Sequence, residues 1–241
     1  MNERRPFRSC ARAPISVLVA AILAGCTLAA PPPAPPAPPA PTGLEIVDRP
    51  IPFSPERVAM TRAYIRAHYG LEVPDISIVP RIIVLHWTAV PTLEGSFNAF
   101  APERIPGART ELSGAGDVNV STHFLVDRDG TIYRLMPETW MARHVIGLNY
   151  EAIGVENVGG AGGREDLTEA QVAANIRLVR YLARKYPTIE YLAGHSEYQA
   201  FEGDPLWRER DAAYRTEKID PGKRFLTAVR AGVRELGLKK K

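Results

Sequence analysis

Residues 31–41, PPPAPPAPPAP, constrain the fold of this chain most strongly, because eight of these eleven residues are proline. Proline has no backbone N–H, so such a run favours polyproline II over helix or sheet. At ~3.1 Å per residue the run predicts a semi-rigid spacer of roughly 34 Å. A Pro-rich ligand for a recognition module is the alternative interpretation. We therefore expect one globular domain over residues 44–241.

The segment before the spacer is typical of an export signal. Four arginines precede an apolar stretch that runs from Ile15 to Leu23, and this stretch is shorter than the ~20 residues of a membrane-spanning helix. Leu23-Ala24-Gly25-Cys26 resembles the bacterial lipobox, in which the cysteine is lipid-modified and becomes the first mature residue. We expect a lipoprotein signal peptide over residues 1–25, and lipidated Cys26 with the spacer over residues 26–43. The alternative is a plain secretory signal with an incidental cysteine.

The predicted lipid anchor also indicates a location. Several acyl chains on Cys26 would hold the protein on a membrane, since each buried methylene contributes ~0.8 kcal/mol. In the lipoproteins that this signal resembles, a residue other than Asp after the cysteine permits passage to the outer membrane, and Thr27 stands here. We expect the protein in the periplasm, lipid-anchored to the outer membrane.

Charge and cysteine content exclude two classes of protein. The chain has 30 Lys and Arg against 27 Asp and Glu, but four arginines and Glu3 precede residue 26, which leaves 26 of each sign. A neutral domain argues against nucleic acid as a partner, because phosphate binding needs clustered positive charge. Cys10 and Cys26 both lie in the first 26 residues, so no disulfide framework is expected in the domain.

The pattern of apolar residues predicts an α/β domain with a central mixed β-sheet flanked by helices. Helices are expected from Ser54 to near His68, from the capping box at Thr168 to Tyr186, and from Pro221 to Leu236, with Asp220 as the N-cap of the last one. Strands are expected at residues 81–85, 123–126, 131–135, 152–155 and 189–192. Residues 91–119 read as long loops with one short helix.

Three of the five histidines lie where predicted strands begin or end. His86 and His195 follow strands and His123 opens one. Strand ends and their loops are where open α/β sheets place their sites. No HExxH helix and no CxxC pair occurs, which excludes the common metalloprotease and zinc-finger patterns. From spacing alone, these histidines are equally well explained as core residues.

Five sequence blocks occur in the order found in the zinc-dependent N-acetylmuramoyl-L-alanine amidases of type 2, which are related to bacteriophage T7 lysozyme and to peptidoglycan recognition proteins. The blocks are IVLHWTA (83–89), HFLVDRDG (123–130), IGVEN (153–157), AGHS (193–196) and KIDPG (218–222). The resemblance covers about residues 78–228. It departs from the family's pattern at Arg143-His144, where the usual intervening aromatic is missing, and at residues 201–217, which form a longer connection than usual.

The resemblance implies a Zn²⁺ cofactor, with His86, His195 and Asp220 as its ligands. Two imidazoles and one carboxylate leave a fourth tetrahedral position for water, which is typical of a catalytic rather than a structural zinc site. Taken singly, His86 and His195 are better explained as core histidines and Asp220 as a helix cap, but the three together in this order favour a metal site.

The resemblance also implies the catalytic groups. Glu156 matches the family's general acid/base, and a carboxylate without a role would be costly to bury in an apolar strand. Lys218 matches the group that stabilises the oxyanion. The alternatives are an edge-strand glutamate and a solvated lysine.

Four further residues are candidate substrate-binding groups. His123 matches a position near the metal, where it either contacts the tetrahedral intermediate or braces the site. Arg143, His144 and Asn157 are predicted to contact substrate, with packing roles as the alternative. Trp87 is expected to form core or pocket wall, and residues 201–217 to form a groove wall, to form a lid or to pack on the body.

The function implied by the resemblance is hydrolysis of the amide between N-acetylmuramic acid and L-alanine, by a zinc hydrolase whose partner is peptidoglycan or a muropeptide. A non-catalytic peptidoglycan-binding lipoprotein is the alternative, and it predicts no zinc. The sequence leaves open the stem-peptide preference and the oligomeric state.

Overall fold

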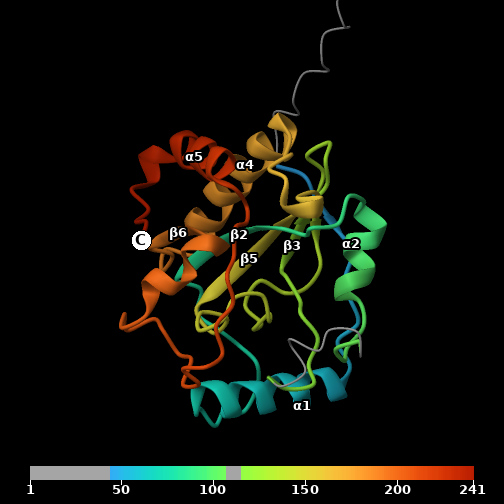
Figure 1. Cartoon of the computed structure of the whole chain (residues 1–241), viewed down its shortest axis with the longest axis vertical. Coiled ribbons are helices and arrows are strands. Elements are labelled where there is room, and N and C mark those ends of the chain that lie inside the picture. Colours follow the sequence, from blue (N-terminus) through green and yellow to red (C-terminus); the bar gives the residue numbers. More distant parts are fainter. Residues whose placement is uncertain (1–43, 107–114) are drawn as a thin grey trace, which may run out of the picture. The chain divides into compact units, whose positions relative to one another are not determined.

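A computed structural model describes residues 44–106 and 115–241. The predicted signal peptide, the lipidation site at Cys26 and the spacer lie outside the described residues. A mixed sheet forms the centre of the described part, as the sequence predicts (Figure 1). It has six strands, one more than predicted, because the short strand β1 was not expected. Its strand order is β1-β4-β3-β5-β2-β6. The strands are β1 (Ile46–Asp48), β2 (Ile82–Trp87), β3 (Phe124–Val126), β4 (Ile132–Arg134), β5 (Ala152–Asn157) and β6 (Tyr191–Gly194).

The strand directions place several strand ends at one edge of the sheet. Strands β3 and β4 form the predicted antiparallel hairpin, and the other neighbouring pairs are parallel. Because β2, β5 and β6 run parallel, their C-terminal ends lie at the same edge of the sheet, and the loops after them meet there.

The strand predicted at residues 189–192 starts two positions later, at Tyr191. Ile189 still belongs to a turn in which its N–H donates to the Tyr186 carbonyl.

The helices are α1 (Pro55–Tyr64), α2 (Leu93–Phe100), α4 (Glu169–Lys185) and α5 (Lys223–Gly232). A π-helical turn (Ile65–Tyr69) continues α1, and 3₁₀ turns lie at Ala161–Gly163, His195–Phe201 and Arg234–Leu236. The capping box at Thr168 and Gln171 is confirmed, as is the Ser54 cap of α1. Among the described residues, no helix has both the length and the apolar character needed to cross a bilayer.

Alternation along the strands gives the sheet two distinct faces. Ile83, Leu85 and Trp87 of β2 share one core cluster with residues of α4 and α5, which lie together on one side of the sheet (Figure 1). Ile82 and Val84 pack into a different cluster, with residues of the 201–207 segment. Because successive side chains of a strand point to opposite faces, His86 lies on the face away from α4 and α5.

The predicted start of the last helix is wrong. Helix α5 begins at Lys223, and its N-cap is Gly222, whose φ of 88° is in the region that favours glycine. The Phe225 N–H donates to Glu165 Oε1 at 2.7 Å, so a side chain from a distant loop satisfies the helix N-terminus. Asp220 therefore lies before the helix, and its carboxylate is free to face the two histidines.

Candidate metal centre and active site

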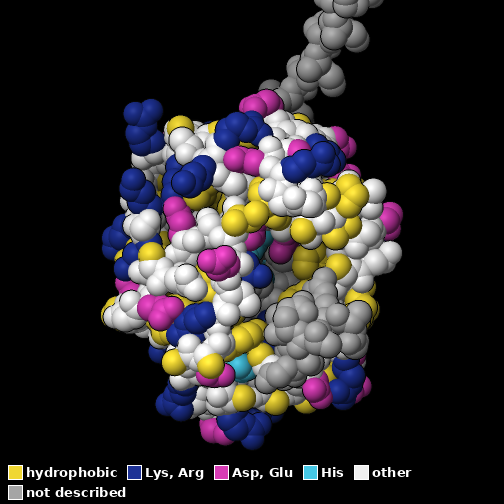
Figure 2. Space-filling view, viewed as in Figure 1, with side chains coloured by type: hydrophobic (Ala, Val, Ile, Leu, Met, Phe, Trp, Pro, Cys, Tyr) yellow, Lys and Arg dark blue, Asp and Glu magenta, His cyan; other side chains and the backbone are white. Residues whose placement is uncertain are grey.

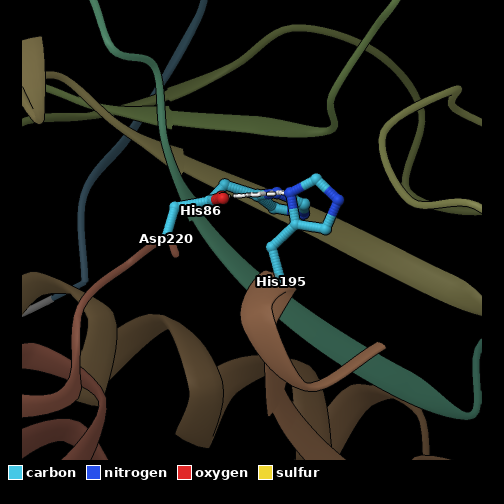
Figure 3. Close-up of side chains that lie close together, drawn as sticks. All are labelled: His86, His195 and Asp220. Carbon is cyan, nitrogen blue, oxygen red and sulfur yellow. Dashed lines mark hydrogen bonds and ion pairs between the residues drawn. The ribbon is translucent and has the colours of Figure 1, made fainter. Parts of the chain in front are cut away.

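His86, His195 and Asp220 come from separate parts of the chain and meet at one point (Figure 3). His86 Nδ1 lies 3.0 Å from His195 Nδ1 and 3.3 Å from Asp220 Oδ2. His195 Nδ1 lies 3.1 Å from the same Oδ2. All three residues are buried. The structure thus brings together the three residues that the sequence predicts as metal ligands.

Two of these residues lie at strand ends, and the third is hydrogen-bonded to one of those ends. His86 is the penultimate residue of β2, and His195 directly follows β6, the parallel neighbour of β2. The backbone N–H of Ser196 donates to the Asp220 carbonyl at 2.9 Å, which ties the segment before α5 to the end of β6. The fold therefore holds the three side chains together.

The donor set fits a tetrahedral metal ion. Bonds of about 2.0–2.1 Å at tetrahedral angles require ligand atoms about 3.3 Å apart. The three observed separations lie between 3.0 and 3.3 Å, close to that requirement. Two nitrogens and one carboxylate oxygen suit Zn²⁺ and leave one of four positions for water or substrate.

Two of these side chains are held in the protonation states that metal ligands need. Burial, with His195 nearby, lowers the pKa of His86 to about 4, which keeps its imidazole neutral. Burial alone would raise the pKa of the Asp220 carboxyl, but the neighbouring His195 and His86 outweigh burial and hold that pKa well below its usual range. A neutral imidazole and an ionised carboxylate are the metal-binding forms of these groups.

Glu156 lies directly beside this cluster. It is the register partner of His86 across the parallel pair of β2 and β5, so their backbones are about 4.8 Å apart. Both side chains lie on the face away from α4, and both line the same pocket. Glu156 is 8% exposed. The structure thus places a mostly buried carboxylate next to the predicted metal.

The pocket has a cavity volume of about 460 Å³ and contains all three predicted ligands. Figure 2 shows the hollow on this face, with histidine at its floor and hydrophobic side chains on the side toward α2. Half-buried Lys218 lines the pocket, and its charge contributes to the lowered pKa of His86. Within residues 44–106 and 115–241, no carboxylate forms an ion pair with Lys218. Its ammonium is therefore available to a ligand in the pocket.

Asn157 and His123 do not reach the pocket, so the structure does not support them as substrate contacts. Asn157 follows Glu156 on β5 and points to the other face, where its Nδ2 donates to the His86 carbonyl at 3.0 Å and its Oδ1 accepts from Asn175. His123 is 0% exposed, accepts from the Gly154 N–H and lies 2.8 Å from the Trp140 carbonyl. Burial lowers the pKa of His123 to about 4, consistent with a neutral bracing role.

Arg143 lines the pocket but is largely engaged by the protein itself. Its guanidinium donates to the Gly116 and Val118 carbonyls at 3.1 and 2.6 Å and to the Tyr214 hydroxyl at 3.1 Å. It also lies over the ring of Tyr64, 4.8 Å from the centroid. Only 3% of the residue is exposed. Arg143 therefore shapes the pocket wall.

The long connection between His195 and Asp220 combines two of the roles considered for it. Phe201 and Leu206 pack into the core beneath β2 and β6, while Tyr214, Thr216 and Glu217 line the pocket. The groove-wall role considered for residues 201–217 covers all three, although no motif singled out Thr216 or Glu217. Tyr64 and Asn149 also line the pocket without a sequence signal beyond their place on a helix and in a loop.

A buried histidine fastens this connection to the π-helical turn after α1. His68 Nδ1 lies 2.9 Å from Glu209 Oε2, and its Nε2 lies 3.1 Å from the Ala115 carbonyl. The Glu209 side chain is 0% exposed. The His68 ring stacks on Tyr64 at 4.1 Å and lies near Tyr214. The pair therefore supports two residues of the pocket wall.

We expect Glu209→Gln to lower the free energy of unfolding by about 1–3 kcal/mol, because buried hydrogen bonds to a charged group are worth that much. Denaturant unfolding measures the change. The control is Glu202→Gln on the same connection, which breaks an exposed pair with Arg215 and should cost ~1 kcal/mol or less. Equal losses in the two variants would contradict the role given to the His68–Glu209 pair.

Comparison with known proteins shows which family the sequence of this chain matches. The family model described as N-acetylmuramoyl-L-alanine amidase matches residues 77–223, more than half of the chain. A search of curated proteins finds no match.

This chain is also similar to several solved structures, of which three are described here. N-acetylmuramoyl-L-alanine amidase LysC from Clostridium intestinale is 22% identical, with 81% of this chain and 99% of that chain covered and a TM-score of 0.49. A selenomethionine derivative of AmpD is 21% identical, with 81% and 95% covered and a TM-score of 0.44. Human PGRP-IβC in complex with glycosamyl muramyl pentapeptide is 16% identical, with 64% and 84% covered and a TM-score of 0.44.

Proposed function

We propose that this chain, which belongs to the N-acetylmuramoyl-L-alanine amidase family, is a zinc enzyme that cleaves the amide between the lactyl group of N-acetylmuramic acid and L-alanine. Its substrate is peptidoglycan or a muropeptide. The observation that carries the proposal is the cluster of His86, His195 and Asp220, with donor atoms 3.0–3.3 Å apart, beside the carboxylate of Glu156. A site of this composition suits metal-assisted amide hydrolysis.

The three ligands would hold Zn²⁺ in this site. When bound, zinc would polarise the amide carbonyl and lower the pKa of a water molecule, which makes that water easier to deprotonate and a better nucleophile. His86 and Asp220 are kept in the neutral and the ionised forms that this role requires. Their burial excludes competing solvent from the ligand atoms.

Glu156 is the proton carrier in this proposal. As water attacks the carbonyl carbon, its carboxylate accepts a proton from that water. It then donates the proton to the departing nitrogen of L-alanine as the carbon–nitrogen bond breaks. The water oxygen remains in the new lactyl carboxyl group, and the amine leaves neutral. The mostly buried position beside His86 supports this role.

Lys218 stabilises the negative charge that develops on the former carbonyl oxygen. It lines the pocket two residues before Asp220, and among the described residues no carboxylate forms an ion pair with it. Charge stabilisation of this kind acts strongly in a site that excludes water. In this proposal Glu156 transfers the proton from water to the leaving nitrogen, and Lys218 stabilises the negative charge on the carbonyl oxygen.

The predicted lipid anchor would place this chemistry beside its substrate. Lipidated Cys26 and the proline-rich spacer would hold the domain at the periplasmic side of the outer membrane, roughly 34 Å from the lipid. The cell-wall polymer and its fragments are present in that compartment.

The proposal is tested by mass analysis of products from purified muropeptides. We expect a saccharide that ends in a free lactyl carboxyl group and a peptide that begins with free L-alanine. A chelator should abolish both products, and added zinc should restore them. Intact muropeptide that binds but is never cut would favour a binding lipoprotein, and cleavage of a glycosidic bond would contradict the amidase proposal.

A further inference from the structure

His144 lies against the side of His86 that is turned away from the metal cluster. His86 Nδ1 faces His195 and Asp220, while its Nε2 lies 3.0 Å from His144 Nδ1. A neutral imidazole has one N–H donor and one acceptor nitrogen. Only the tautomer of His86 with the proton on Nε2 leaves the Nδ1 lone pair for a metal. The residue facing Nε2 therefore matters to metal binding.

The surroundings of His144 select its own tautomer. Its Nε2 lies 3.4 Å from the Ala152 carbonyl, which can only accept a hydrogen bond. The proton of a neutral His144 ring therefore belongs on Nε2, and its Nδ1 is an acceptor. His144 Nδ1 then accepts a hydrogen bond from His86 Nε2. The lone pair on His86 Nδ1 is left directed at His195 and Asp220.

The position of the His144 ring is defined by the structure around it. The backbone N–H of His144 donates to Asn149 Oδ1 at 2.8 Å. A Cβ atom on Gly154 would lie only 2.8 Å from the ring's Cγ and Nδ1, so the ring fills the space that this glycine leaves on β5. His123 lies edge-on to the ring at 6.0 Å between centroids.

We propose that His144 is a positioning residue that fixes the tautomer of His86 and thereby raises the affinity of the site for zinc. This inference rests on the metal site of the proposed function. It differs from the substrate contact predicted for His144, and it also excludes His144 as a fourth ligand at the cluster. Its Nδ1 faces Nε2 of His86, the nitrogen directed away from His195 and Asp220.

The test compares His144→Leu, which removes the acceptor, with His144→Asn, whose Oδ1 stands near the place of Nδ1 and can accept. Zinc affinity is measured by competition with a chromophoric chelator. We expect a loss of about 10–100-fold for His144→Leu, as for other residues that orient metal ligands. We expect His144→Asn to stay within a few-fold of the wild-type protein.

A second readout follows the tautomer itself. Nitrogen NMR of the metal-free protein should show the proton on His86 Nε2 in the wild-type and His144→Asn proteins, and a mixture in His144→Leu. Gly154→Ala should reduce zinc affinity as well, because the added methyl displaces the His144 ring. If His144→Leu does not fold, Gly154→Ala and His144→Asn still decide the question.

Two outcomes would overturn the inference. One is wild-type zinc affinity in both His144→Leu and Gly154→Ala. The other is an equal loss in His144→Leu and His144→Asn with the His86 tautomer unchanged. Neither readout depends on turnover, so failure to cleave muropeptides would count against the proposed function and leave the tautomer result intact.

Discussion

Glu156→Gln is expected to lower muropeptide turnover by about 10²–10⁴-fold while zinc content stays at the wild-type level. The amide has the shape of the carboxylate but cannot accept and return a proton, and general acid–base catalysis contributes a factor of this size. The loss corresponds to about 3–5 kcal/mol in the activation free energy. Zinc is retained because Glu156 is not among the three clustered ligand atoms.

The measurement is the initial rate of amine release, with zinc determined on the same samples. Exposed Glu72→Gln is the control, since Glu72 pairs only weakly with Arg66 at the surface. Turnover of Glu156→Gln within a few-fold of the wild-type protein would remove Glu156 from the mechanism. Loss of zinc together with turnover would mean that Glu156 supports the metal site instead.

Asp220→Ala is expected to weaken zinc binding by more than about 100-fold. Losing an outer residue that orients a ligand typically costs 10–100-fold, and in the proposed site Asp220 would supply a ligand oxygen itself. The Oδ2 atom lies 3.1 and 3.3 Å from the two histidine nitrogens, so its removal opens the cluster on one side. Turnover should fall with zinc occupancy and recover in part at high zinc concentration.

Chelator competition measures this change, and the control is Asp75→Ala. Asp75 is exposed, accepts a hydrogen bond from the Ser77 N–H and does not line the pocket that contains the cluster. Asp220→Ala with wild-type zinc affinity would show that the metal is held elsewhere. Such a result would separate the family assignment, which rests on the sequence match, from the ligand set assigned to this chain.

The order of the helices and of strands β2 to β6 could be predicted from local patterns, whereas the short edge strand β1 was not predicted. The capping box at Thr168 and the cap at Ser54 involve residues close in sequence, so the pattern defines those helix starts. The start of α5 could not be predicted in this way. Its N-terminus is capped by Glu165, 60 residues away, and Asp220 is drawn instead toward His86 and His195.

The cluster of His86, His195 and Asp220 could be predicted because its sequence blocks occur in the family's order. Which other polar residues face the pocket could not be predicted. Glu156 and Asn157 are adjacent in one block, but strand alternation sends them to opposite faces of the sheet. His123 and Arg143 carry polar groups of the right kind, yet the backbone carbonyls of Trp140, Gly116 and Val118 accept from them or lie within hydrogen-bond distance. Such tertiary hydrogen bonds leave no local signal in the sequence.

The most decisive experiment titrates the metal-free protein with zinc and follows amine release from a muropeptide. We expect no turnover without metal and a linear rise of turnover that levels off at one zinc per chain. Asp220→Ala should gain turnover only at high zinc concentration, without levelling off at one equivalent, and Glu156→Gln should take up one zinc without gaining turnover. Full activity of the metal-free protein, or levelling off at one zinc per chain in Asp220→Ala, would show that the cluster of His86, His195 and Asp220 is not a catalytic zinc site.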